Sequence, residues 1–209
     1  MSPLPIILVG AGGHARSCID VIEQAGSYDI AGLIAVPSEV GSQTLGYEVL
    51  GTDTDLTGLF QRFDHALIAV GQIKTAETRI RLFQLLENMD CRLPTIISPH
   101  AYVSRHATLG AGTIVMHGAV INAGANVGRN CIVNSQALVE HDTEIANHCH
   151  ISTAAAVNSG VSVGEGTFIG SGASVRQGIR IGTHCVIGMG QRVLKDYLDY
   201  SQLPPERPE

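Results

Sequence analysis

An aliphatic residue returns at every sixth position of this chain between residues 103 and 193. The series is Val103, Leu109, Val115, Ile121, Val127, Val133, Val139, Ile145, Ile151, Val157, Val163, Ile169, Val175, Ile181, Ile187 and Val193. A period of six fits neither the 3.6-residue period of a helix nor the two-residue alternation of a strand. It is typical of a solenoid in which each hexapeptide supplies one short strand and one corner, and three hexapeptides form a triangular coil. The stretch therefore predicts a parallel β-helix of about five coils.

The positions between the aliphatic residues fit the same architecture. Four residues after most of them the side chain is small, and Gly or Asn is frequent at the remaining positions. We expect the small residues to pack inside the prism and Gly or Asn to take corners with positive φ. Cys131, Cys149 and Cys185 fall in the inward phase, so we interpret them as core residues. The odd total of five cysteines and the lack of a CxxC motif argue against disulfide or metal chemistry.

The start of the chain has a different pattern. Residues 5–10 (PIILVG) predict a buried strand, residues 10–16 (GAGGHAR) a glycine turn, and the residues through about 24 a helix. The turn matches the GxGxxG/A pattern of dinucleotide-binding folds. The predicted second strand, residues 30–36, ends in Ala35 and Val36 rather than in an acid that would bind a ribose, so we do not expect an NAD site. The turn instead predicts an anion site for a phosphate or pyrophosphate, with a ligand-free tight turn as the alternative.

Further strands are predicted at 47–50, 66–71 and 92–97, and a helix at 75–89. Alternating strands and helices indicate an α/β domain around a small parallel sheet. We therefore divide the chain into an α/β domain (1–97), the hexapeptide β-helix (98–194) and a polar, proline-rich tail (195–209) that caps or leaves the open end of the prism.

Charge and hydropathy limit the partners. The net charge of −6 gives no basic surface for nucleic acid or an anionic membrane. No apolar run approaches the ~20 residues that span a bilayer, and the first ten residues are too short and uncharged for a secretory signal. We expect a cytoplasmic protein without membrane insertion or nucleic acid as a partner.

The segment 139–152 (VEHDTEIANHCHIS) concentrates polar side chains on an otherwise plain solenoid. His141 is expected at or near a corner, and an imidazole with a pKa of about 6.5 suits a general base near neutral pH. The adjacent Asp142 is placed to fix its tautomer. The alternative is a solvated surface pair. A zinc site at His148 to His150 is less favoured, because Cys149 is predicted to point inward.

Six segments together resemble the NeuD/PglD family of bacterial sugar acetyltransferases: GAGGHAR (10–16), LGYEVLG (45–51), AVG (69–71), SPHAYVSRHATLGAGTIVM (98–116), INAGANVG (121–128) and VEHDTEIANHCHIS (139–152). The resemblance implies a nucleotide-sugar-binding α/β domain followed by a left-handed β-helix, assembled as a homotrimer with active sites between subunits. It also implies acetyl transfer from acetyl-CoA to an amine or hydroxyl of a sugar, with no metal.

The resemblance also implies residue roles. His141 matches the catalytic base and Asp142 the acid that orients it. The residues implied in binding the nucleotide sugar are Gly12, Gly13, His14 and Gly71. Those implied in binding acetyl-CoA are His150, Ser159, Gly160, Gly170, Gly188 and Gly190. This chain departs from the family at Ala35 and Val36, where many relatives have acids, and at residues 202–206 (QLPPE), where the solenoid of relatives closes differently.

The resemblance implies transfer to the 4-amino group of a nucleotide-activated 4-amino-4,6-dideoxy sugar in bacterial surface glycan biosynthesis. We expect direct transfer in a ternary complex. His141 would act as base, and a backbone N–H near Ser159 or the His150 ring would hold the oxyanion. His141 and His150 lie half a coil apart, so a shared site would form between subunits. The alternatives are O-acetylation of sialic acid or a related sugar, a zinc-dependent carbonic anhydrase and a non-enzymatic trimeric scaffold.

Overall fold

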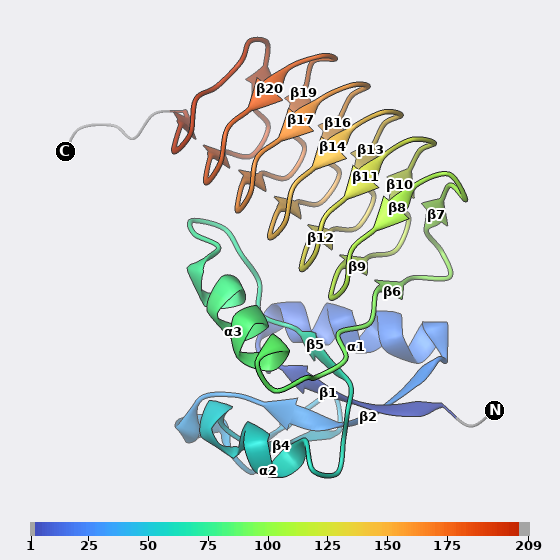
Figure 1. Ribbon diagram of the computed structural model, residues 1–209, viewed down its shortest axis with the longest axis vertical. Helices are drawn as coiled ribbons and strands as arrows, with labels where there is room; N and C mark the ends of the chain where they lie inside the picture. The colour runs from blue at the N-terminus through green and yellow to red at the C-terminus, as the bar shows by residue number, and fades with distance from the viewer. Residues whose placement is uncertain (1–2, 205–209) are drawn as a thin grey trace.

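The computed structural model describes residues 3–204. The chain forms an α/β domain and a long parallel β-helix, and one side of the β-helix lies over the domain (Figure 1). The predicted fold class, a small α/β domain followed by a left-handed parallel β-helix, is confirmed.

The α/β domain is built around a five-stranded sheet with the strand order β3-β4-β2-β1-β5. Its strands are β1 (Leu4–Val9), β2 (Tyr28–Ile34), β3 (Gln43–Thr44), β4 (Tyr47–Gly51) and β5 (Ala66–Ile68). Its helices are α1 (Gly13–Ala25), α2 (Leu56–Leu59) and α3 (Glu77–Glu87), with the 3₁₀ turns η1 (Pro37–Glu39) and η2 (Asp53–Asp55). All pairs are parallel except β3 with β4.

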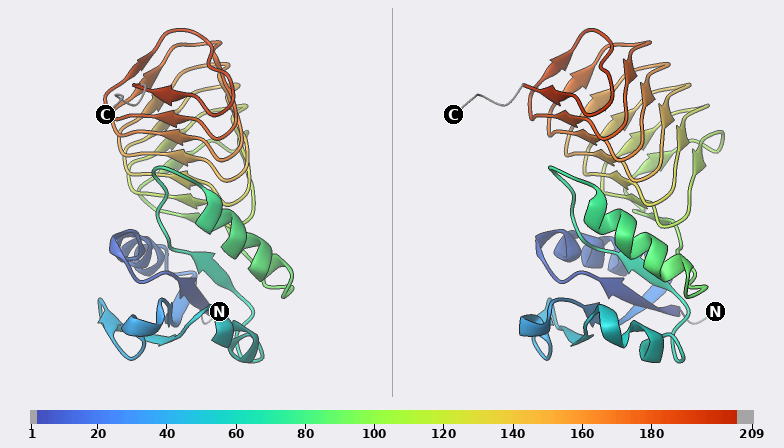
Figure 2. Two further views of the ribbon diagram at one scale, coloured as in Figure 1. Left: turned by 90° about the vertical axis from the view of Figure 1, so that its left-hand side faces the viewer. Right: turned by 60° about the vertical axis from the view of Figure 1, so that its left-hand side comes forward.

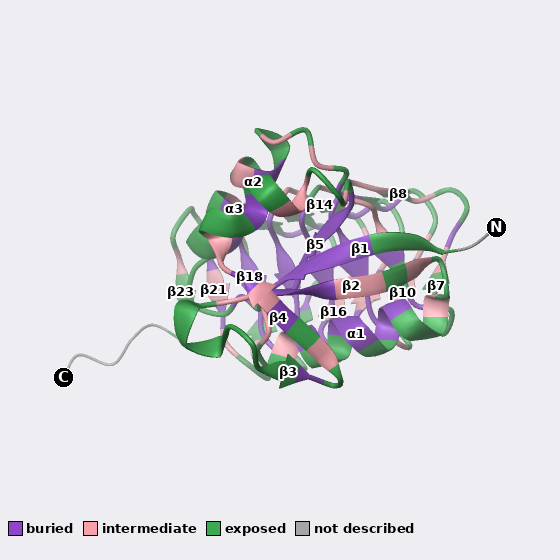
Figure 3. Ribbon diagram, turned by 90° about the horizontal axis from the view of Figure 1, so that it is seen from below, coloured by how far each residue is buried: buried purple, intermediate pink, exposed green. Residues whose placement is uncertain are grey.

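The two faces of this sheet are buried against different partners, because β1 sends alternate side chains to opposite sides. Ile6 and Leu8 pack with α1 and with Ile114, Met116 and Ile132 of the β-helix. On the other face, the alternate residues of β1 pack with α2 and α3. The buried strands and the buried side of α1 are visible in Figure 3. One core therefore joins the α/β domain to the β-helix.

The β-helix stacks two-residue strands into three flat sheets, which give a triangular prism (Figure 2). One sheet has six strands: β7 (Tyr102–Val103), β10 (Val120–Ile121), β13 (Leu138–Val139), β16 (Ala156–Val157), β19 (Ser174–Val175) and β22 (Arg192–Val193). A second has five: β8 (Thr108–Leu109), β11 (Asn126–Val127), β14 (Glu144–Ile145), β17 (Ser162–Val163) and β20 (Arg180–Ile181). The third, which we call the domain-facing sheet, has seven: β6 (Ile96–Ile97), β9 (Ile114–Val115), β12 (Ile132–Val133), β15 (His150–Ile151), β18 (Phe168–Ile169), β21 (Val186–Ile187) and β23 (Gln202–Leu203).

The periodic aliphatic residues occupy the second position of each strand from β7 to β22, as the six-residue period predicts. Cys131, Cys149 and Cys185 lie inside the prism in its apolar core, which confirms their inward phase. The corners confirm the expected positive φ: every sixth residue from 112 to 190 has it. The residue type differs from the expectation, however. Besides Gly and Asn130, the corners hold Gln136, Asp142, His148, Ala154 and His184.

The prediction that residues 92–97 form the last strand of the α/β domain is wrong. Arg92 makes only an isolated bridge to His65, and β6 pairs in parallel with β9. Ile96 is an aliphatic residue whose local pattern does not specify which sheet it joins. The domain-facing sheet therefore begins with the residues that connect the two domains.

The far end of the prism is covered by the chain that follows the repeat. Tyr197 bridges Ile181, and β23 pairs in parallel with β21, so residues 195–204 extend two of the sheets. Of the departure noted at 202–206, Pro205 and Glu206 lie outside the described residues, as does the rest of the predicted tail to residue 209.

Candidate functional site

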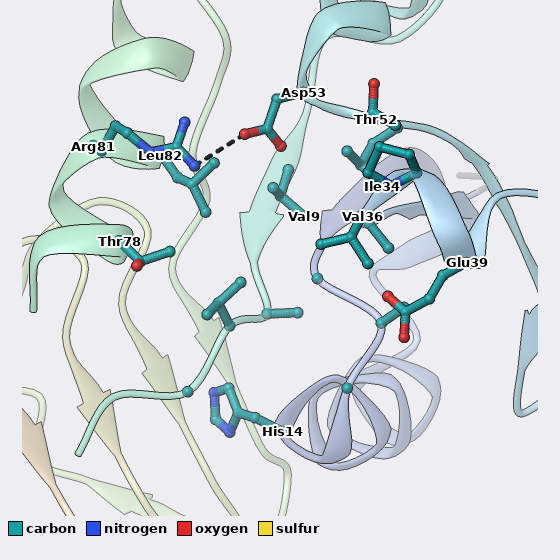
Figure 4. Close-up of a pocket in the computed structure, with 18 of the residues that line it drawn as sticks. Val9, His14, Ile34, Val36, Glu39, Thr52, Asp53, Thr78, Arg81 and Leu82 are labelled. Carbon is teal, nitrogen blue, oxygen red and sulfur yellow. Dashed lines mark hydrogen bonds and ion pairs between the residues drawn. The ribbon is translucent and has the colours of Figure 1, made fainter. Parts of the chain in front are cut away.

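A cavity of about 510 Å³ lies at the carboxyl ends of β1, β2 and β5. It is lined by Val9, Gly10, Ala11, Gly12, Gly13, His14, Ile34, Ala35, Val36, Pro37, Glu39, Thr52, Asp53, Thr54, Ala69, Val70, Gly71, Thr78, Arg81 and Leu82. Figure 4 shows the glycine turn and His14 at one end and the Arg81–Asp53 ion pair at the other. We call it the turn cavity.

The glycine turn leaves the start of α1 free to bind an anion. Gly12 is the N-cap, no side chain caps the helix, and its first turn contains no acid. The first backbone N–H groups of a helix have no intrahelical acceptor and attract anions. A Cβ added to Gly12 or Gly13 would meet nothing within 4 Å, so the turn faces open space.

A second cavity, of about 650 Å³, lies between the loop after β5 and the domain-facing sheet. We call it the seam cavity. It is lined by His14, Gly71, Gln72, Ile73, Lys74, Asn134, His150, Ser152, Phe168, Ser171, Val186, Gly188, Met189 and Gln202. His14 and Gly71 line both cavities, so a ligand in the turn cavity can extend past them toward His150.

His14 stands on the wall between the two cavities. Its Nε2 atom is buried and has no hydrogen-bond partner among residues 3–204. Burial, with the nearby charge of Arg79 and the His150 ring, lowers the pKa of His14 to about 3. The ring is therefore neutral at physiological pH, and its unpartnered nitrogen is available to a polar ligand atom.

His150 is also neutral, and its hydrogen bonds fix its tautomer. Burial, followed by the charge of Arg79, lowers its pKa to about 4, against the opposing effect of the Gln72 carbonyl. Nδ1 lies 2.6 Å from the Gln72 carbonyl oxygen, which only accepts, so the proton must be on Nδ1. Nε2 therefore accepts, which agrees with the Asn134 amide at 3.2 Å. This geometry contradicts the predicted oxyanion role of His150, because Nε2 has no proton to donate.

Arg79 fixes the loop that separates the cavities. Its guanidinium is fully buried and donates to the carbonyl oxygens of Ile68, Val70 and Asn130 and to the side-chain oxygen of Asn130. Helix α3 is thereby joined both to the end of β5 and to a corner of the β-helix. Gln72 adds a second link, since its amide donates to the Gly166 carbonyl oxygen.

The His141–Asp142 pair lies on a different part of the prism. It occupies the corner between β13 and β14, with His141 Nδ1 2.9 Å from Asp142 Oδ2. The His141 side chain is 58% exposed, as predicted, and lines neither cavity. Asp142 adopts φ 57°, which turns its carboxylate back onto the preceding ring. The arrangement places a proton on Nδ1 and leaves Nε2 free to accept one.

The residues proposed to bind acetyl-CoA fall into two groups. Ser159 and Gly160 lie one coil above the dyad, where Gly160 N–H donates to the His141 carbonyl oxygen. The Ser159 N–H has no acceptor within residues 3–204, so it is free to donate. Gly170, Gly188 and Gly190 follow strands of the domain-facing sheet. At Gly170 a Cβ would lie 2.6 Å from backbone atoms of the next coil, so close stacking alone requires glycine there.

Within one chain the structure brings His14, Gly71 and His150 together and leaves His141 and Asp142 on another edge of the prism. Sequence analysis missed Gln72, Arg79 and Asn130, whose contacts join residues up to 94 positions apart. Arg79 was visible only as a cation on the predicted helix, and no local pattern marked it as buried. In residues 3–204, no three His, Cys, Asp or Glu side chains form a group that could hold a metal ion.

Comparisons with known proteins agree with these features. Residues 5–85 match the PglD N-terminal domain, and residues 160–194 match the hexapeptide repeat of succinyl-transferase. The structure of PerB from Caulobacter crescentus, in complex with CoA and GDP-perosamine, is 33% identical with a TM-score of 0.89, over 95% of this chain and 92% of PerB. The chain belongs to the NeuD/PglD family of sugar acetyltransferases.

A second member of this family gives the same picture. The acetyltransferase domain of PglB from Neisseria gonorrhoeae, in complex with acetyl coenzyme A, is 29% identical with a TM-score of 0.87, over 96% of this chain and 95% of that domain. A comparison with curated protein sequences found no match. Membership in the NeuD/PglD family makes this protein an acyltransferase. No helix in residues 3–204 is long and apolar enough to cross a membrane.

Proposed function

We propose that this protein transfers the acetyl group of acetyl-CoA to the 4-amino group of a nucleotide-activated 4-amino-4,6-dideoxy sugar. The observation that carries the proposal is the His141–Asp142 pair, a histidine with a free Nε2 and a carboxylate on Nδ1. The PerB structure supports the substrate class, since that protein binds CoA and GDP-perosamine.

The two cavities have the chemistry that such a substrate needs. The free helix start and the glycine turn suit a diphosphate, and the apolar wall formed by Val9, Ile34 and Val36 suits a nucleoside. The sugar would then reach past His14 and Gly71 into the seam cavity, beside the hydrogen bond between the Asn134 amide and Nε2 of His150.

The active site would form between subunits of a homotrimer. His141 lies between β13 and β14, whereas the seam cavity lies on the domain-facing sheet. One chain therefore does not supply both halves of the site. A neighbouring subunit that presents its His141 corner to the seam cavity would complete it, with acetyl-CoA between the two prisms.

The transfer proceeds by direct attack. The amine nitrogen forms a bond to the thioester carbonyl carbon, and Nε2 of His141 takes the proton that the nitrogen loses. The Ser159 N–H is placed to hold the oxyanion, a contribution of about 3–4 kcal/mol for such donors. The C–S bond then breaks, and the imidazolium returns its proton to the CoA sulfur. Asp142 stabilises the imidazolium in between.

The test is CoA release from acetyl-CoA, followed with a thiol reagent, over a panel of 4-amino sugars on GDP, UDP, dTDP and CMP, with free sialic acid included. We expect turnover with a 4-amino nucleotide sugar and a loss of about 10²-fold or more in His141→Ala. His106→Ala is the matched control, because His106 is an exposed histidine on the same edge of the prism, outside both cavities. Equal rates in the two variants would refute the assignment of the base.

Two further results separate the alternatives. Turnover only with sialic acid would establish the O-acetyltransferase function instead. Initial rates at varied concentrations of both substrates are expected to show a ternary complex, because the proposed direct attack forms no acetyl-enzyme. A monomeric variant with full activity would contradict the site between subunits.

A further inference from the structure

The turn cavity contains an acid that the end of β2 lacks. In nucleotide-binding α/β folds, a carboxylate near the end of the second strand accepts hydrogen bonds from ribose hydroxyls. Here β2 ends at Ile34 and is followed by Ala35 and Val36, which offer no side-chain acceptor. The chain then forms the 3₁₀ turn η1, which ends at Glu39.

Glu39 reaches the cavity from this turn. It lines the turn cavity together with Ala35, Val36 and Pro37. Figure 4 shows its carboxylate between Val36 and the first turn of α1, on the side of the cavity where the glycine turn lies. Glu39 N–H donates to the Val36 carbonyl oxygen, and the Ser42 hydroxyl donates to the Glu39 carbonyl oxygen, so local backbone contacts define its position.

The carboxylate is free to accept a ligand. Within residues 3–204 its oxygens take part in no hydrogen bond or ion pair. The two nearby arginines bind other groups: Arg81 pairs with Asp53, and Arg79 donates to buried carbonyl oxygens. The turn cavity is therefore left with one unpaired carboxylate, on the side where the glycine turn lies.

We propose that Glu39 binds the 2′- and 3′-hydroxyls of the ribose and makes this enzyme specific for sugars carried on a ribonucleoside diphosphate. With the diphosphate at the start of α1 and the base toward Arg81 and Asp53, the ribose lies beside Glu39. The two carboxylate oxygens accept from the two hydroxyls of the diol. A 2′-deoxyribonucleotide such as dTDP offers only one of these donors. This inference rests on the proposed function, since it assumes that the turn cavity holds the nucleotide.

The test measures nucleotide binding without acetyl transfer. Calorimetric titration compares GDP with 2′-deoxy-GDP, and UDP with 2′-deoxy-UDP, on the wild type, Glu39→Ala, Glu39→Gln and Glu48→Ala. Glu48 is the matched control, an exposed glutamate on β4 that does not line the cavity. One hydrogen bond to a charged acceptor corresponds to about tenfold or more in affinity.

The wild type and Glu48→Ala are expected to bind the better ribonucleotide about tenfold more tightly than its 2′-deoxy form. Glu39→Ala is expected to reduce this ratio to about two or less, and Glu39→Gln, which keeps one acceptor oxygen, to an intermediate value. The role of Glu39 would be overturned if nucleotides bind but the wild type shows no preference for the ribonucleotide, or if Glu39→Ala leaves that preference unchanged. Either result would leave the proposed function standing. Failure of every nucleotide to bind would overturn both.

Discussion

Replacing Arg79 by methionine should destabilise the protein more than the same replacement of Arg81, an exposed cation on the same helix. The Arg79 guanidinium is buried with no acidic partner in the described part of the chain. Its hydrogen bonds are 2.9 Å to Ile68 O, 2.7 Å to Val70 O, and 3.1 and 2.6 Å to the two oxygens of Asn130. Burial lowers the pKa of Arg79 to about 10, so the group stays charged at neutral pH. Methionine fills the apolar part of the space and donates nothing.

The magnitude follows from the acceptors left behind. A buried acceptor without a donor costs about 1–3 kcal/mol, so four acceptors at the low end amount to about 4 kcal/mol. Removal of a charge that was costly to bury offsets part of this loss, which leaves a net loss of about 2–4 kcal/mol. In a chain of this length the melting temperature should fall by roughly 10 °C.

The assay is urea unfolding followed by circular dichroism, at one protomer concentration because assembly would shift the midpoint. Arg81→Met is the matched control. It lies on the same helix, is 59% exposed and pairs with Asp53 at 3.0 Å, an exposed pair that contributes about 0–1 kcal/mol. If the two variants differ by less than about 1 kcal/mol, the buried contacts of Arg79 do not stabilise the junction as argued.

Three further predictions follow from the site. A Cβ on Gly124 would collide with Asp142 Oδ1, whereas a Cβ on Gly172 would meet nothing within 4 Å, although φ is positive at both glycines. Gly124→Ala should therefore lower kcat about tenfold or more relative to Gly172→Ala, at equal expression and melting temperature. Burial lowers the pKa of His14 to about 3 and that of His150 to about 4. Below pH 6.5 the unfolded chain therefore binds more protons than the folded chain. The free energy of unfolding should fall from pH 6.5 toward pH 4 by up to about 1.4 kcal/mol per pH unit for each histidine. Urea midpoints measured at pH 7, 6 and 5 should fall less steeply with decreasing pH in His150→Asn than in the wild type. An equal pH dependence in the two proteins would contradict the role of His150. His150→Asn keeps a donor for the Gln72 carbonyl and loses the Nε2 acceptor, so KM or kcat should change by about tenfold while the fold is retained; unchanged kinetics would exclude a role for Nε2.

The solenoid was predictable because its signal is local and repeated. Each hexapeptide must bury one aliphatic side chain, and parallel stacking then fixes the register of every strand, so all the positions from Val103 to Val193 fall in phase. The strand at 92–97 was misassigned for the complementary reason. A short aliphatic segment such as Ile96–Ile97 specifies burial but not its pairing partner, which here is β9 and not the α/β sheet.

The site was predictable in part. The glycine turn and the His141–Asp142 pair are short motifs whose chemistry can be read from adjacent residues. The seam cavity depends instead on Gln72 and Arg79, which bind residues 94 and 51 positions away. The tautomer of His150 depends on a third long-range contact, to the Gln72 carbonyl oxygen. Long-range hydrogen bonds of this kind leave no periodicity in the sequence. Residue types alone could therefore name His150 but could not decide whether it donates or accepts.

The corners of the prism give a last physical argument for where function lies. Glycine fills most of the other corners, with His184 as the exception, but five consecutive corners hold Asn130, Gln136, Asp142, His148 and Ala154 with φ between 54° and 59°. A non-glycine residue in this conformation costs about 1 kcal/mol or more. Such strain persists where the side chain or the backbone has a structural or functional role. Three of the five side chains have an identifiable use: one accepts from Arg79, one orients His141, and one packs edge-on against Phe83. The longest run of such corners thus lies in the coils that join the domains and carry the dyad, which supports placing the chemistry there.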